Sequence, residues 1–367
     1  MSTMLFISLA RHQGLYFAQL LAATGLAGKV VTAAQLPFPR SLRLRAQVDW
    51  QPVIAEKCAE RRVKHRSEGI LYRLALRLEL WVMALRMQAL FERERPATLV
   101  LWNGAHRYCR LLVALAPPGC TVFFFENGLL PNTTTLDAKG VNFLNSVPRC
   151  AQFYRDYHSR YAAPASPPPD LIPRAPRVPG IAQVELPERF VFIPFQDDRD
   201  TQVRLFSPWI GNMADLFDLG ERLQRETGLT VVFKEHPSSP MTYPQLHART
   251  HDYLFFANGN STQELIERCE YVVTINSTVG LESVLLGKPV MTLGQAFFNI
   301  DGLVVHADDA VSALRQAKAY PQWSLEEPVR QGFLNYLTRE YCIPGRWQDA
   351  EPAHLQAVAE RLRQGAQ

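Results

Sequence analysis

The stretch that decides the fold is Thr274-Ile275-Asn276-Ser277-Thr278-Val279-Gly280-Leu281-Glu282. A short apolar strand ends here in polar groups, and a helix follows at once and closes at Gly287-Lys288-Pro289. A Ser- and Thr-rich helix start after a strand is where an α/β domain holds a phosphate, because free backbone N–H groups and the helix dipole point there. Glu282, one turn further on, could hold ribose hydroxyls. We therefore predict a nucleotide-binding half.

A second segment of the same kind is Phe233-Lys234-Glu235-His236-Pro237. A lone histidine is more often structural, but His236 follows a buried strand and Pro237 fixes the turn, so we favour a role in phosphate binding or acid chemistry. Lys234 or Glu235 could point elsewhere, since neighbours on a strand alternate faces. Ser277 and Thr278 could simply cap their helix, which is compatible with phosphate binding at the same helix end.

Strands and helices alternate around these segments throughout the second half of the chain. The expected strands are residues 190–195, 230–233, 253–256, 271–275 and 290–293, and the expected helices are residues 215–226, 261–269 and 281–286. This alternation predicts a parallel sheet with helices on both faces. The first half opens with a strand, a helix and a strand (4–10, 16–23, 29–33), and continues with long helices in 51–95 and strands at 98–102 and 121–125.

A proline-rich stretch, residues 164–187, marks the boundary between the two halves. We predict an acceptor-side Rossmann-like domain over 1–165, a linker over 166–187, and a nucleotide-sugar-binding Rossmann-like domain over 188–325. Helices over 326–367 are expected to pack back on the first domain. Two α/β halves joined by a linker place a cleft between them, which is the GT-B arrangement of glycosyltransferases. The fold class is therefore predicted to be α/β of the GT-B type.

The charge of the chain is divided unevenly between its halves. Residues 1–187 carry 23 Lys and Arg against 12 Asp and Glu, whereas residues 188–367 carry 16 against 23. The basic half indicates an anionic partner such as a membrane surface, a phospholipid head group or an acidic glycan. The alternative is a solvated face whose arginine stems cover apolar surface. No nucleic-acid partner is expected.

Composition favours a cytoplasmic protein. The chain has 367 residues and six cysteines without CxxC spacing, which we interpret as reduced thiols rather than disulfides or a zinc site. The apolar start is short and has no basic residues before it, so it is predicted to be a strand rather than a signal peptide. No apolar run approaches the ~20 residues that a membrane span needs.

Two carboxylates are candidates for the chemistry. Glu126 follows three phenylalanines at the end of a strand, where partial burial in the cleft would suit acid/base work, although it could instead be a capping or ion-paired glutamate. Asp198-Arg199-Asp200 matches a metal-binding DxD pattern, but such acids usually form a solvated loop, and no metal is expected. A single aspartate acting as nucleophile or base is favoured, and Thr201 and Gln202 could hold it or the substrate.

Together, these segments resemble the bacterial capsule-polysaccharide and lipopolysaccharide β-Kdo transferases, where Kdo is 3-deoxy-D-manno-oct-2-ulosonic acid. The resemblance covers roughly residues 100–300. It is carried by Glu126-Asn127-Gly128-Leu129-Leu130-Pro131 with Lys139-Gly140-Val141-Asn142, by Gln196 with Asp200-Thr201-Gln202, by Lys234-Glu235-His236-Pro237, and by 276–282 with Gly287-Lys288-Pro289-Val290. The motifs are specific in combination, whereas any one of them alone would be weak.

The resemblance implies a retaining transfer of Kdo from CMP-Kdo to a lipid or lipid-linked glycan acceptor, on the inner face of the cytoplasmic membrane. Asp200 matches the aspartate that forms a covalent adduct, and Glu126 matches the glutamate that assists proton transfer at the acceptor. The donor would be held by His236, Ser277 and Glu282, and we add Lys234, Asn276, Thr278 and Gln202 to this donor-binding set. No cofactor is expected, because a monophosphate leaving group needs no metal.

Several alternatives stay open on the sequence alone. The acceptor could be phosphatidylglycerol, as for a capsule linker, or the end of an O-antigen chain. The sequence of residues 127–135 slightly favours the O-antigen chain. A GT-B transferase that uses another CMP- or UDP-sugar is a second reading. A third is a non-catalytic polysaccharide-binding or export protein that has kept the fold.

Overall fold

The computed structural model describes residues 4–63, 66–161, 171 and 180–365. The chain forms two compact units. We call Met1–Gly128, Asn132–Ser146 and Cys342–Gln367 the N-terminal unit, and Leu129–Pro131 with Val147–Tyr341 the C-terminal unit. Each is described by itself.

A six-stranded sheet forms the centre of the N-terminal unit, with the strands in the order β12-β5-β4-β3-β1-β2. The four strands predicted from the sequence are parallel, whereas β5 is antiparallel to β4 and β12 is antiparallel to β5. The strand bounds are β1 Met4–Ser8, β2 Gly28–Thr32, β3 Thr98–Trp102, β4 Thr121–Asn127, β5 Thr133–Asp137 and β12 Ile343–Pro344.

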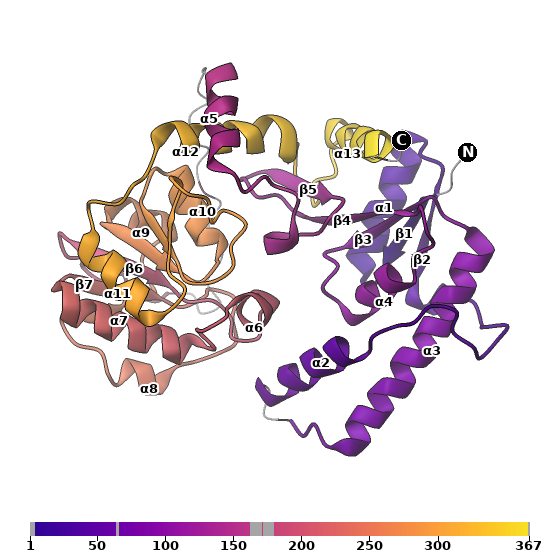
Figure 1. Ribbon diagram of the computed structural model, residues 1–367, viewed down its shortest axis with the longest axis horizontal. Coiled ribbons are helices and arrows are strands. Elements are labelled where there is room, and N and C mark those ends of the chain that lie inside the picture. The colour runs from indigo at the N-terminus through magenta and orange to yellow at the C-terminus, as the bar shows by residue number, and fades with distance from the viewer. Residues whose placement is uncertain (1–3, 64–65, 162–170, 172–179, 366–367) are drawn as a thin grey trace. The chain divides into compact units, whose positions relative to one another are not determined.

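Helices cover both faces of this sheet, and its strands are therefore buried on both sides. Leu5 and Leu99 pack into one core with α2 (Gln51–Val63), α3 (Ile70–Glu94) and α4 (Arg107–Leu115). Phe6 and Val100, which point the other way, pack into a second core with α1 (Arg11–Thr24) and α13 (Pro352–Gly365). Figure 1 shows these layers around the N-terminal sheet.

The C-terminal unit is a doubly wound parallel sheet with the strand order β11-β10-β9-β6-β7-β8. The chain starts in the middle at β6, moves outward to β8, and then returns to build the other half from β9 to β11. This is the Rossmann order, and its switch point lies between β6 and β9. The strands are β6 Phe190–Pro194, β7 Thr230–Lys234, β8 Leu254–Phe256, β9 Tyr271–Thr274, β10 Val290–Thr292 and β11 Val305–His306.

Helices flank this sheet wherever the sequence pattern predicted them, and shorter helices join them. The bounds are α6 Thr201–Phe206, α7 Met213–Thr227, α8 Pro244–His247, α9 Thr262–Arg268, α10 Thr278–Leu285 and α11 Ala310–Ala319. The core below them is fully buried and includes Val191, Phe217 and Phe233. The predicted parallel α/β organisation of this half is therefore confirmed.

The compact units divide the chain at other places than the sequence suggested. We placed residues 151–160 in the first domain, yet α5 (Ala151–Arg160) groups with the C-terminal unit. The reason is that α5 packs against α12 (Glu327–Tyr336). The ring of Tyr154 packs on the ring of Phe333. The backbone of Tyr154 lies so close to α12 at Gly332 that a side chain there would collide with it. The segment that returns to the N-terminal unit starts at Cys342 rather than at 326. Most of the predicted linker, 166–187, lies outside the described residues.

Candidate active site

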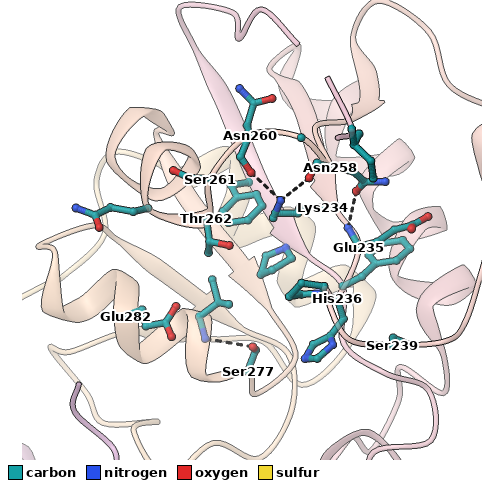
Figure 2. Close-up of a pocket in the computed structure, with 18 of the residues that line it drawn as sticks. Lys234, Glu235, His236, Ser239, Asn258, Asn260, Ser261, Thr262, Ser277 and Glu282 are labelled. Carbon is teal, nitrogen blue, oxygen red and sulfur yellow. Dashed lines mark hydrogen bonds between the residues drawn. The ribbon is translucent and has the colours of Figure 1, made fainter. Parts of the chain in front are cut away.

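A pocket of about 600 Å³ lies in the C-terminal unit at the carboxyl ends of its strands. It collects residues that follow β6, β7, β8 and β9, which is the edge where open α/β sheets bind ligands. Four of the predicted donor-binding residues line it, namely Lys234, His236, Ser277 and Glu282. Figure 2 shows these four with other lining residues.

His236 and Ser277 provide the polar groups at one end of the pocket (Figure 2). His236 is half-buried, and its Nδ1 lies 3.3 Å from the hydroxyl of Ser238. The side chain of Ser277 caps α10 by accepting from the N–H of Val279 at 3.1 Å. The sequence left two roles open for Ser277, helix capping and phosphate binding. These roles are compatible, because this capping residue also lines the pocket.

Lys234 has a structural task in addition to its place on the pocket wall. Its ammonium group donates to the carbonyl oxygens of Asn258 and Asn260, each at 2.7 Å (Figure 2). Burial lowers the pKa of this lysine below its ordinary value. Lys234 therefore connects the loop after β8 to the end of β7, and its third N–H group can donate to a ligand.

The loop after β8 is one part of the pocket that the sequence did not indicate. Asn258, Gly259, Asn260, Ser261 and Thr262 all line the pocket. The signal was present, because this run has the same pattern of polar residues and a helix-capping serine after a buried strand that we used at 276–282. This run was not recognised because the strand before it has only three residues and follows an exposed tyrosine.

The wall next to this loop comes from residues near the end of the proline-rich stretch. The amide group of Asn260 pairs with both backbone groups of Val184, at 3.0 and 3.1 Å. At Gly259 a side chain would collide with the carbonyl of Ala182, so a glycine is needed for this close approach. Ile181 and Gln183 are thereby fixed on the pocket surface.

Asn276 lies behind the pocket rather than in it. Its amide nitrogen donates to the carbonyl oxygens of Gln202, Phe206 and Gln295 at 3.0, 3.1 and 3.4 Å. Its amide oxygen accepts from Gln196 at 3.0 Å, and the residue is buried. Every hydrogen-bonding group of the side chain is therefore used inside the protein, and Asn276 acts as a scaffold for the loops around it.

Asp200, Gln202 and Thr278 also lie outside the set of pocket-lining residues. Asp200 is exposed and caps α6, where its Oδ1 accepts from the N–H of Gln202 at 3.0 Å. Its other carboxylate oxygen has no hydrogen bond among the described residues. Gln202 has a buried side-chain oxygen with no partner in that part of the chain. Thr278 is the first residue of α10.

The two preceding aspartates have clear structural partners. Arg199 donates two hydrogen bonds to the carboxylate of Asp197, at 3.0 and 2.8 Å. Burial alone would raise the pKa of Asp197, but the ion pair with Arg199 outweighs burial and holds this pKa below its ordinary value. Asp198 accepts from the N–H of Met213 at 2.7 Å and from the hydroxyl of Tyr243 at 3.1 Å. Burial raises the pKa of Asp198.

The raised pKa of Asp198 leads to a stability prediction. A carboxyl group whose pKa is higher in the folded protein than in the unfolded chain stabilises the fold only while protonated, so this contribution is lost as pH rises through the folded pKa. At neutral pH the ionised carboxylate is therefore a cost, which the isosteric amide of Asp198→Asn avoids while still bonding to Met213 and Tyr243. We expect this variant to melt no lower than wild type at pH 7.5.

The measurement is the melting temperature of both proteins between pH 7.5 and 4. The advantage of Asp198→Asn should shrink as pH falls through the raised pKa of Asp198, where the wild-type carboxyl group becomes protonated. A variant that melts several degrees lower at pH 7.5 would show that the ionised form is the stabilising one.

Glu126 lies in the N-terminal unit, at the end of β4. Its carboxylate accepts from the side-chain amide of Asn103 and, at 2.9 Å, from the backbone N–H of Asn127. Asn127 in turn accepts from the indole N–H of Trp347 at 2.8 Å. The glutamate is thus half-buried and held by neutral donors, without an ion pair among the described residues.

In the described ranges, no three His, Cys, Asp or Glu side chains come together as they would around a metal ion. None of the helices in that same part of the chain combines the length and apolarity of a membrane span.

Comparison with protein families places the pocket in a known group. The family model of the capsule polysaccharide biosynthesis proteins matches residues 180–342, which contain nearly all of the pocket. The similarity to this family therefore extends over these residues, which are less than half of the chain. The match begins with the wall segment of Ile181 and Gln183 and extends through α12.

Two curated proteins are similar to this chain. Protein FixF of Sinorhizobium fredii is 36% identical over 257 residues, which are 70% of this chain and 62% of FixF. The capsule polysaccharide export protein KpsS of Escherichia coli is 26% identical over 172 residues, 43% of each chain. The chain spans less than two thirds of either relative.

One solved structure has the same fold as this chain. It is the Thermosulfurimonas dismutans KpsC, beta Kdo 2,7 transferase, matched with a TM-score of 0.51 and 14% identity over 98% of this chain and 99% of that one. The predicted GT-B fold class is thereby confirmed. The predicted resemblance to the β-Kdo transferases is confirmed at the level of the fold.

Proposed function

We propose that this protein is a retaining β-Kdo transferase. It would move Kdo from CMP-Kdo to a lipid or lipid-linked glycan acceptor in the synthesis of a bacterial surface polysaccharide. The observation that carries the proposal is the pocket at the carboxyl edge of the C-terminal sheet, where His236, Ser277 and Glu282 come together within the residues that match the capsule polysaccharide biosynthesis family.

CMP fits the chemistry of this pocket. The monophosphate would lie at the start of α10, where the helix dipole and the hydroxyl of Ser277 meet the imidazole of His236. Glu282, one turn along the same helix, would accept from ribose hydroxyls. A single phosphate carries less charge than a diphosphate, and for that reason we include no metal in the proposal.

The transfer would proceed in two displacements. An oxygen of Asp200 attacks the anomeric carbon of Kdo, the bond from that carbon to the phosphate oxygen breaks, and CMP leaves. The acceptor hydroxyl then attacks the same carbon, Asp200 is released, and Glu126 takes the hydroxyl proton. In support, Asp200 is exposed and one of its carboxylate oxygens is not engaged in capping α6.

Acceptor and location complete the proposal. The basic N-terminal half would approach an acceptor that is phosphatidylglycerol or the end of a lipid-linked O-antigen chain, at the cytoplasmic face of the inner membrane. A second candidate is a non-catalytic role in capsule export, which the name of the relative KpsS favours. The two candidates differ in their need for a nucleotide.

Nucleotide binding by calorimetry tests the proposal. Wild type should bind CMP and bind UDP at least tenfold more weakly. His236→Ala should weaken CMP binding by about ten- to a hundredfold, because a hydrogen bond to a charged group contributes roughly 1.5–3 kcal/mol.

His251→Ala is the matched control, because His251 is exposed and does not line the pocket. It should bind CMP as wild type does. Equal binding of UDP and CMP would favour a transferase for another sugar nucleotide, and no binding of either would favour the export role.

A further inference from the structure

One surface of the N-terminal unit is both apolar and exposed. Along α3, the residues Ile70, Leu71, Leu74, Leu78 and Val82 have exposed fractions of 75, 79, 57, 61 and 40%. Their spacing of three and four residues puts Leu71, Leu74, Leu78 and Val82 on one side of the helix. This stripe runs for about 16 Å, given a rise of 1.5 Å per residue. Figure 1 shows this half of α3 extending beyond the sheet of its own unit.

The opposite side of α3 shows that the stripe is not a core face. Leu76, Leu80, Ala84 and Met87 are buried and pack against the sheet of the unit. The helix therefore has two apolar sides, of which one is used for folding. An ordinary surface helix is polar on its outer side, so the exposed stripe calls for a partner.

The loop before α2 continues the exposed stripe. Arg45 donates through its backbone to Gln88 at 2.8 Å and pairs with Glu92 at 3.4 Å, so the loop lies along the second half of α3. On the loop, Phe38 is 87% exposed and Leu42 is 71% exposed. Phe38 lies near Arg86, which is one turn beyond Val82. We call the stripe on α3 together with these two loop residues the α3 face.

The charges around the α3 face have one predominant sign. Residues 37–82 carry ten Lys and Arg against five Asp and Glu. Arg40, Arg43 and Arg77 are exposed and have no ion pair among the described residues. An apolar stripe beside unpaired arginines matches the two layers of an anionic lipid surface, with acyl chains below and negative head groups above.

We propose that the α3 face docks the protein on an anionic lipid bilayer. The leucines and Phe38 enter the boundary between head groups and acyl chains, while Arg40, Arg43 and Arg77 contact lipid phosphates. Charge argues against a second copy of the chain as the partner, because a two-fold contact would bring equal sets of arginines together. Docking is independent of which sugar nucleotide the C-terminal unit binds.

Flotation with vesicles tests the proposal. Wild type should float with vesicles that contain phosphatidylglycerol and stay behind with vesicles of phosphatidylcholine alone. The triple variant L71Q/L74Q/L78Q should partition at least about tenfold less onto the anionic vesicles, because three apolar side chains no longer enter the lipid. R40Q/R43Q/R77Q should lose most of the preference for anionic lipid, and added salt should weaken wild-type binding.

The matched control is L15Q/L144Q/V311Q, which removes three side chains of similar exposure (62, 56 and 70%) outside the α3 face. It should float as wild type does, and all variants should keep the wild-type melting temperature. Equal flotation of L71Q/L74Q/L78Q and the control would overturn the proposal. The proposal would also be overturned if wild type formed a dimer that L71Q/L74Q/L78Q abolishes and did not bind to vesicles. CMP binding measured alongside would report on the proposed function separately.

Discussion

Asp200→Ala should lower the rate of Kdo transfer from CMP-Kdo by at least about a thousandfold. The reason is that the proposed first displacement has no nucleophile without this carboxylate, and water is a poor substitute at a carbon that already carries a carboxylate. CMP binding should change little, since Asp200 is not among the residues that line the pocket.

Intact mass spectrometry after incubation with CMP-Kdo provides the direct readout. Wild type should gain the mass of one Kdo residue, and Asp200→Ala should not. Asp309→Ala is the matched control, because Asp309 is also an aspartate that caps a helix of the C-terminal unit, α11. It loses a cap of the same kind and should keep both the adduct and the rate. An Asp200→Ala protein that retains a tenth of the wild-type rate would contradict the proposed mechanism.

Asn276→Asp should destabilise the C-terminal unit by about 3 kcal/mol or more. The substitution keeps the shape of the side chain but replaces an N–H₂ group that faces three carbonyl oxygens with an oxygen, in a buried position. For a unit of this size, we expect the melting temperature to fall by roughly 6–12 °C. The pocket should lose CMP affinity as a consequence of the loosened loops.

Asn258→Asp is the comparison that isolates this effect. The side-chain oxygen of Asn258 accepts from the backbone N–H of Glu235 at 2.8 Å, and an aspartate can accept in the same way. Thermal unfolding should therefore separate two chemically identical substitutions by several degrees. If both variants melt together near wild type, Asn276 does not have the scaffold role that its contacts indicate.

The sequence pattern was sufficient for five of the six strands of the C-terminal sheet, all except β11, and for the edge where the pocket lies. Each apolar run that ends in polar residues became a strand of that sheet, because period and burial are local properties of the chain. His236 and Ser277 were found by the same reasoning. Asn276 belongs to the same motif but is oriented towards its own protein, and no local pattern distinguishes an amide that faces a ligand from one that faces carbonyl groups 70 residues away.

Contacts between distant segments account for most of what the sequence did not indicate. The grouping of α5 with α12 depends on Tyr154 and Gly332, which are far apart in the chain. Strand β5 was missed because its threonines follow a glycine and an asparagine and resemble a loop. The wall formed by Ile181 and Gln183 was missed because it lies within a stretch that is typical of a linker.

The strand β12 and the helix α13 have a consequence for how the protein is made. Both belong to the N-terminal unit, where β12 pairs with β5 and α13 covers one of the two cores, yet they are encoded after the C-terminal unit. On the ribosome, the N-terminal unit has an open sheet edge and an uncovered core until β12 and α13 have emerged, whereas almost all of the C-terminal unit is one continuous stretch that can fold earlier. The N-terminal unit therefore begins to emerge before the C-terminal unit but is completed after it.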